Sequence, residues 1–164
     1  MRIKKVENIQ KKFSKLPWAI IFAEEYARET RSELLREIGK MLRRPGFTTV
    51  TVPKRLENYT IASTERVFYY EGIGILREFT VISPTTEFSV EVASNKGEII
   101  SGTYTQLHSD SMALDFLVAI PKNSNYMVKV SNIGYDKWIK AVINVDSPVK
   151  FTEIRVLNDV IVRK

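Results

Sequence analysis

The sequence has 164 residues, of which 44% are hydrophobic and 27% charged, and this composition is typical of one globular domain with enough apolar residues for a core. There is no Cys, which excludes disulfides, thiolate metal sites and a Cys nucleophile. Residues 1–44 hold 12 of the 25 Lys and Arg but 6 of the 19 Asp and Glu, so the whole net charge of +6 lies in this segment. The lack of Cys, together with only two Gln, is typical of a reducing compartment or of a thermophile.

Residues 3–15 are predicted to form a short amphipathic helix that Pro17 ends. Five lysines make this segment an electrostatic arm: Lys4, Lys5, Lys11, Lys12 and Lys15. Such a cluster either contacts nucleic acid or another anionic surface, or is the solvated face of a helix. The longest apolar run nearby, residues 18–23, is far shorter than the ~20 residues of a membrane span, so we expect neither a membrane span nor a secretion signal.

Residues 18–42 have the strongest helical pattern in the chain, because apolar residues recur seven apart and their neighbours broaden the stripe. We expect this stripe to be the contact with another subunit or with the rest of the chain, through Ile20, Ala27, Leu34, Leu35, Ile38, Met41 and Leu42. Pro45 and Gly46 are expected to stop the helix. The sequence therefore divides into a basic N-terminal helical arm, residues 1–44, and a second part, residues 45–164.

From residue 47 the hydrophobic period changes from 3.6 to 2, which indicates strands. We expect short strands at residues 47–52, 58–63, 65–70, 74–82, 87–93, 98–104, 113–120, 125–133, 137–145, 149–156 and 160–162. The breaks between them, among them Pro53 and Asn158-Asp159, have the spacing of an antiparallel sandwich, and no helical pattern separates strands as in a parallel sheet.

Residues 71–100 give the clearest alternation, because Phe88, Val90 and Val92 are predicted to face inward on a strand that is followed by a turn at residues 95–97. A second hairpin is expected around residues 121–125. Its predicted inward side chains are Leu114, Phe116, Val118 and Ile120 on one strand and Tyr126, Val128 and Val130 on the other.

The sequence contains no catalytic signature. Its one His, His108, is close to Ser and Asp in residues 107–111, but triad members come together from different elements, so a loop or a short helical turn is the expected structure. With one His and no Cys, a zinc or iron site is not expected, and no Asp-x-Asp-x-Asp run indicates calcium. We therefore expect no cofactor, no metal and no enzymatic activity.

The aromatic side chains of the strand region are candidates for a carbohydrate-binding face, although strands are also rich in aromatic residues that pack in a core. These candidates are Tyr59, Phe68, Tyr69, Tyr70, Tyr104, Tyr126, Tyr135 and Trp138.

Residues 70–157 resemble virion proteins of tailed phages and related prokaryotic viruses. The resemblance lies in residues 72–83, which follow a Gly-x-Gly-x-Leu pattern, in the strands at 87–92 and 97–100, and in two later strands at 126–135 and 151–156. The turn differs, because Asn95-Lys96-Gly97 stands where Asp-Gly is expected.

The resemblance implies a jelly-roll-like antiparallel β-sandwich that acts as a structural piece of a particle, located in the virion or in the host cytoplasm during assembly. We therefore expect a mainly β protein with an N-terminal helical arm that works as a homo-oligomer with other structural proteins. Two alternatives stay open: a carbohydrate-binding surface-attachment module, and a nucleic-acid-binding protein that uses the basic arm.

Overall fold

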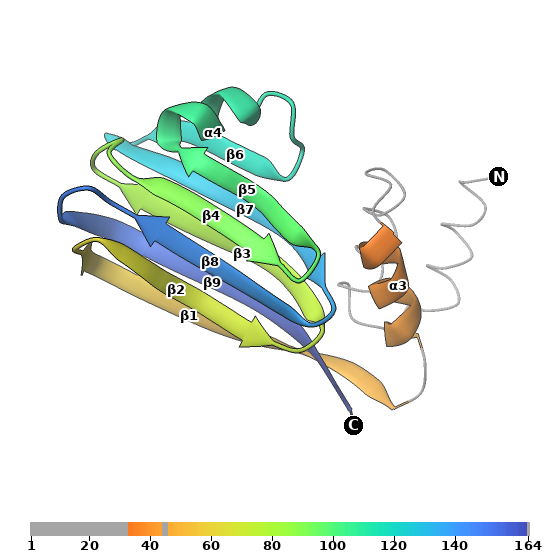
Figure 1. The fold of residues 1–164 in the computed structure, drawn as a ribbon. Coiled ribbons are helices and arrows are strands. Elements are labelled where there is room, and N and C mark those ends of the chain that lie inside the picture. Colours follow the sequence, from red (N-terminus) through yellow and green to blue (C-terminus); the bar gives the residue numbers. More distant parts are fainter. Residues whose placement is uncertain (1–32, 44–45, 164) are drawn as a thin grey trace.

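The computed structural model describes residues 33–43 and 46–163, which form two antiparallel sheets packed face to face (Figure 1). Sheet A has the order β1 (Phe47–Ile61), β9 (Val149–Arg163), β3 (Gly74–Ser83), β7 (Asn125–Tyr135) and β6 (Leu117–Lys122). Sheet B has the order β2 (Thr64–Glu71), β8 (Trp138–Asn144), β4 (Ser89–Ser94) and β5 (Gly97–Thr103). The prediction of a mainly β antiparallel sandwich is thereby confirmed.

The strands pair in a nested order. β4 pairs with β5, β3 with β7, β2 with β8 and β1 with β9, so strands early in the chain pair with strands late in the chain. The partners are alternately in sheet B and in sheet A, and the chain crosses between the sheets as it passes from β1 to β2, to β3 and to β4. The arrangement is that of one long hairpin that has been folded over on itself.

One hydrophobic core fills the space between the sheets, as the period-2 pattern predicts. Phe88, Val90 and Val92 of the β4 region are buried as expected, and Phe79 of β3 and Phe151 of β9 are completely buried opposite them in the same core. Phe88 and Phe151 meet edge to face with their ring centroids 5.5 Å apart. Full burial of one such side chain stabilises the folded state by roughly 1.5–3 kcal/mol relative to leaving it exposed to water.

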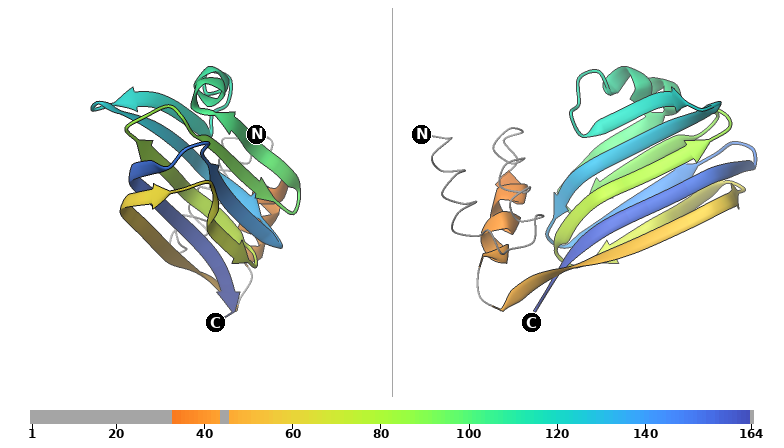
Figure 2. Two further views of the ribbon diagram at one scale, coloured as in Figure 1. Left: turned by 60° about the vertical axis from the view of Figure 1, so that its left-hand side comes forward. Right: turned by 180° about the vertical axis from the view of Figure 1, so that it is seen from behind.

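Helix α3 (Glu33–Leu42) lies beside β1 and β7 at one end of the sandwich (Figure 2). It corresponds to the last part of the helix predicted over residues 18–42, and it is followed by a turn in which Gly46 has a φ of +96°. Helix α4 (Tyr104–Asp110) begins with a capping box, in which Thr103 Oγ1 accepts from Gln106 N and Gln106 Oε1 accepts from Thr103 N.

The prediction that Pro53 closes a strand is wrong, because β1 continues through it to Ile61. Among the described strands, β1 is at the edge of sheet A and pairs with β9 alone. A Pro on an edge strand costs no hydrogen bond when its nitrogen faces away from the partner strand. Residues 47–52 and the first part of 58–63 therefore belong to a single strand.

The predicted strand at residues 113–120 is wrong in both its start and its register. β6 begins at Leu117, and it buries Leu117 and Ala119, whereas Val118 and Ile120 are 36% and 42% exposed. The hairpin itself is confirmed: β6 pairs with β7 through a two-residue turn, Asn123-Ser124, in which both residues have positive φ. Apolar residues on both faces of this edge strand made the register ambiguous from the sequence.

The predicted break at Asn158-Asp159 does not exist, because β9 runs unbroken through both residues. Both side chains are buried and have tertiary partners. The Tyr135 hydroxyl donates to Asn158 Oδ1 at 2.7 Å, and Thr51 Oγ1 donates to Asp159 Oδ1 at 2.6 Å. Arg77 Nε lies 3.5 Å from Asp159 Oδ2. Two hydrogen bonds and one ion pair, which come from three other strands, thus hold this polar pair inside β9.

Gly74 makes room for this network. A Cβ at position 74 would lie 2.5 Å from the Tyr135 hydroxyl oxygen and 2.5 Å from the carbonyl oxygen of Asp159. Because side-chain carbons do not approach so closely, any other residue here would push β3 away from Tyr135. The second glycine of the Gly-x-Gly pattern is therefore a packing requirement of this fold.

We predict that Tyr135→Phe lowers the free energy of unfolding by about 1–3 kcal/mol, because it leaves Asn158 Oδ1 buried without its donor. Urea denaturation measures the change. Tyr69→Phe is the matched control, since Tyr69 is 38% exposed, and its effect should stay within about 0.5 kcal/mol. Equal stability of Tyr135→Phe and wild type would show that the network does not stabilise the fold.

A second prediction concerns alkaline pH. Burial raises the pKa of the Tyr135 phenol well above its ordinary value of 10.0, although the hydrogen bond with Asn158 acts in the opposite direction. Above about pH 10 the unfolded chain releases this proton while the folded chain keeps it, so stability falls as the pH rises. Urea denaturation from about pH 8 to about pH 11 should show a steeper loss for wild type than for Tyr135→Phe. Parallel curves would contradict this.

Candidate functional site

The residues predicted as the helical contact are only partly within the described chain. Ile38 is 1% exposed, so it is buried within the protomer on a helix that lies beside β1 and β7. Leu34, Leu35, Met41 and Leu42 are on α3, but their side chains lie outside the described part. Ile20, Ala27 and the arm lysines Lys4, Lys5, Lys11, Lys12 and Lys15 lie outside the described residues.

His108 has a structural position on α4. Its Nδ1 lies 2.6 Å from the carbonyl oxygen of Ala119 on β6, and its ring stacks on Tyr104 with the centroids 6.0 Å apart. Ser111 Oγ donates to the main-chain oxygen of His108. The short helical turn expected for residues 107–111 is thus confirmed, and the contacts of His108 tie α4 to the edge of sheet A.

Asp136 and Asp146 lie at opposite ends of β8 and cannot share a cation. Asp136 precedes β8 and accepts from Asn95 Nδ2 at 2.6 Å, whereas Asp146 follows β8 at the other end of the sandwich. Within residues 33–43 and 46–163, no group of three His, Cys, Asp or Glu side chains is placed to hold a metal ion.

One hollow of the described surface lies at the end of the sandwich away from α3. It is an open depression of about 570 Å³ between the β3–β4 connection, the end of β5 and the loop after β8. Its lining residues are Thr86, Glu87, Phe88, Ser89, Thr103, Asn144, Val145 and Asp146. Most of these side chains are polar and open to water, so the depression offers hydrogen-bonding groups over a floor to which Phe88 contributes.

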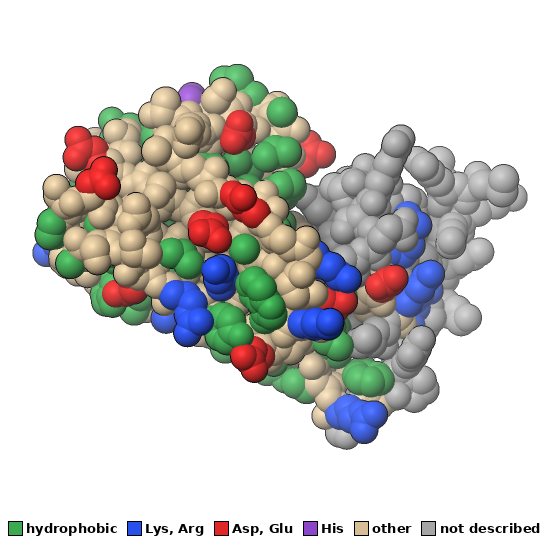
Figure 3. Space-filling view, in the orientation of Figure 1, with side chains coloured by type: hydrophobic (Ala, Val, Ile, Leu, Met, Phe, Trp, Pro, Cys, Tyr) green, Lys and Arg blue, Asp and Glu red, His purple; other side chains and the backbone are tan. Residues whose placement is uncertain are grey.

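The depression continues onto the outer face of sheet B as a groove of about 420 Å³. The groove shares Ser89 and Asn144 with the depression and is further lined by Thr64, Val90, Glu91, Ser101 and Val142. The Thr64 hydroxyl donates to Asn144 Oδ1, which links β2 to β8 across the groove. In Figure 3, which views this face, uncharged polar side chains and backbone lie over β4 and β5 with acidic side chains among them. A surface lined by hydroxyls, an amide and a carboxylate suits a polyhydroxylated ligand.

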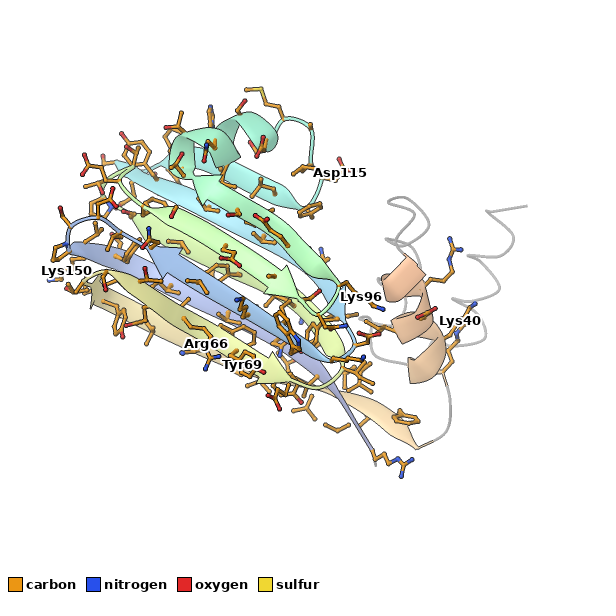
Figure 4. The ribbon with its side chains drawn as sticks, viewed as in Figure 1. Lys40, Arg66, Tyr69, Lys96, Asp115 and Lys150 are labelled. Carbon is orange, nitrogen blue, oxygen red and sulfur yellow. The ribbon has the colours of Figure 1, made fainter. Side chains whose placement is uncertain are left out.

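The other half of the outer face of sheet B carries an aromatic and cationic patch, which we define as Arg66, Tyr69, Trp138 and Lys140. The guanidinium carbon of Arg66 lies 4.3 Å from the ring centroid of Tyr69, and both side chains point outward from β2 (Figure 4). Lys140 Nζ lies 5.9 Å from the Trp138 ring centroid on β8. The Tyr69 hydroxyl donates to a Glu71 carboxylate oxygen at 2.6 Å, and this bond raises the pKa of Tyr69. Its cation-covered ring and bonded hydroxyl make Tyr69 a fixed part of the surface.

Most of the other aromatic candidates belong to the core. Tyr104 and Tyr135 are buried, and four more pack against the core while partly exposed: Tyr59, Phe68, Tyr70 and Tyr126. Two aromatic candidates, Tyr69 and Trp138, share the outer face of sheet B. The sequence alone does not distinguish them from the core aromatics, because the β2–β8 register decides which strand positions face outward. The groove was not predicted either, since its lining comes from four strands and their connections.

No helix in residues 33–43 and 46–163 has the length and apolar character needed to cross a membrane. A comparison with protein-family models gave no match to this sequence, and no curated protein matches it significantly.

Proposed function

We propose that the protein is a non-enzymatic structural component of a virion that works by packing against further copies of itself and other structural proteins. The observation that carries the proposal is the nested strand order, in which β1–β9–β3–β7 and β2–β8–β4–β5 form the two sheets. This is the order that a jelly roll acquires when one long hairpin is folded over, with β6 added at the edge. Jelly rolls serve as viral capsid domains and as lectins, so the fold favours assembly or attachment.

Of the two roles, assembly and attachment, the described surface favours assembly. Val50 and Val52 on β1 are 47% and 43% exposed, and Val118 and Ile120 on β6 are also exposed, so both edge strands of sheet A carry apolar side chains. Exposed apolar residues along sheet edges are unfavourable in free energy for an isolated protomer, and burial against another chain removes this unfavourable contact with water. On this proposal, the basic arm of residues 1–44 adds an electrostatic contact with a neighbouring subunit or with nucleic acid.

We predict that the full-length chain has a native mass that is a multiple of the protomer mass, and that deletion of residues 1–44 leaves a folded sandwich of lower oligomeric order. Multi-angle light scattering after size exclusion measures the mass, and circular dichroism checks the fold. Deletion of residues 1–32, which keeps α3 and the buried Ile38, is the matched control that separates the arm from the helix. A protomer mass at every concentration of the full chain would contradict the assembly role.

The carbohydrate-binding alternative is supported by one specific feature, the hydroxyl-lined groove on the outer face of sheet B, whose other half carries Trp138 and Tyr69. If the groove binds glycans, Asn144→Ala should weaken binding at least about tenfold, because Asn144 lines both parts of the hollow. A glycan array followed by tryptophan-fluorescence titration of the best hit tests this. Ser131→Ala on sheet A is the matched control, and an array without hits would remove the alternative.

A further inference from the structure

The outer edge of β1 is a long strand edge that the protomer leaves open. In sheet A, β1 pairs with β9 on one side, and no strand among residues 33–43 and 46–163 pairs with its other side. In Figures 1 and 2, β1 lies at the margin of the sandwich, and α3 stands over the first residues of β1 without covering this margin. No other strand of the described residues therefore takes up the main-chain groups along this edge.

Pro53 identifies which residues of β1 direct their main-chain N–H and C=O groups toward the open edge. Proline has no N–H to give to a ladder, so Pro53 occupies a position whose main-chain groups face away from β9. The β1–β9 register is continuous from residue 47 to residue 57, so alternate residues share this direction. Phe47, Thr49 and Thr51 consequently present their N–H and C=O groups at the open edge, while the residues between them bond to β9.

The two halves of β1 differ in how they are protected from pairing. The second half contains Pro53, Lys54 and Arg55, and a proline with charged residues is how natural sheets block an edge. Residues 47–52, with the sequence Phe-Thr-Thr-Val-Thr-Val, contain no charge and no proline, and all but the first are β-branched. The unprotected half is also the part where Val50 and Val52 are exposed.

We propose that residues 47–52 pair antiparallel with the same residues of a second copy of this chain, around a two-fold axis at Thr49. In this register Thr49 faces Thr49 of the second copy, and Phe47 faces its Thr51. Each of these pairs exchanges two N–H···O bonds, so the three outward residues of both copies form six bonds with none left over. The two copies of sheet A become one continuous sheet. The inference rests on the proposed assembly role and names one of its contacts.

The choice of a second copy follows from the symmetry of the segment and from its neighbours. The outward groups at 47, 49 and 51 are evenly placed about Thr49, as an isologous contact requires. Pro53 interrupts the row of outward N–H donors, so the uninterrupted row of outward donors ends at Thr51. The nearby cation Arg55 is already paired with Glu57 at 2.8 Å and Glu153 at 3.2 Å, so its charge does not prevent the approach of a second basic chain. The pairing also shields Val50 and Val52 from water.

Amide hydrogen exchange, followed by NMR on the full-length protein at several concentrations, tests the contact. The amides of Phe47, Thr49 and Thr51 should be protected at concentrations where the protein is associated and should lose protection on dilution. The intervening amides, which bond to β9, serve as the internal reference and should stay protected throughout. Free exchange of the three outward amides in the associated protein would overturn the proposal.

A proline variant tests the same contact by mass. Thr49→Pro removes an outward N–H and no N–H that bonds to β9, so it should keep the β9 pairing but raise the dimer dissociation constant by about tenfold or more. Thr49→Ala is the matched control, because it shortens the side chain and keeps the N–H, and its dissociation constant should change less than about threefold. Sedimentation equilibrium measures both. Equal dissociation constants for a folded Thr49→Pro and Thr49→Ala would overturn the proposal, and if Thr49→Pro does not fold, the exchange experiment decides alone.

The outcomes separate this contact from the assembly role itself. A full-length chain that associates while its three outward amides exchange freely overturns the β1 contact and leaves the assembly role in place. A chain that stays a protomer at all concentrations overturns both.

Discussion

Nested antiparallel pairing is the constraint on which the rest of the structure depends. β9 pairs with β1 on one side and with β3 on the other, so this late strand joins two early strands within sheet A. The pairing brings the apolar faces of two sheets together, and it places the ends of four strands and their connections around one polar hollow. It also fixes β1 and β6 as the edges of sheet A, with apolar side chains exposed on both.

The architecture was predictable where local and tertiary preferences agree. The alternation of Phe88, Val90 and Val92 predicted a half-buried strand, and every residue of that set is buried. The prediction failed where tertiary partners override a local signal. Pro53 was interpreted as a strand end, yet an edge strand tolerates a missing N–H. Asn158-Asp159 was interpreted as a break between strands, yet Asn158 Oδ1 accepts from Tyr135 and Asp159 is bonded by Thr51 and paired with Arg77 inside β9.

The candidate site was less predictable than the fold. Sequence composition drew attention to the aromatic residues as a class, but the register of β2 on β8 decides that Tyr69 faces outward while Tyr70 packs on the core beside Tyr135. The groove depends on small polar residues such as Ser89 and Ser101, which carry no signal in a sequence because Ser is common at any wet position of a strand. A site composed of one residue from each of several strands becomes visible only when strand order and register are known.

The nested order also has a consequence for how the chain acquires its structure. The β4–β5 hairpin joins residues that are close in sequence, so it can form early, whereas β1 and β9 pair residues about a hundred positions apart. High contact order of this kind slows folding, because loop-closure entropy is lost before the distant contacts form. During synthesis, β1 leaves the ribosome long before β9, so it has no partner strand in sheet A until β9 has been synthesised. In that interval its β-branched first half lacks a partner on both edges, and this is the stage at which the nascent chain is most prone to aggregation.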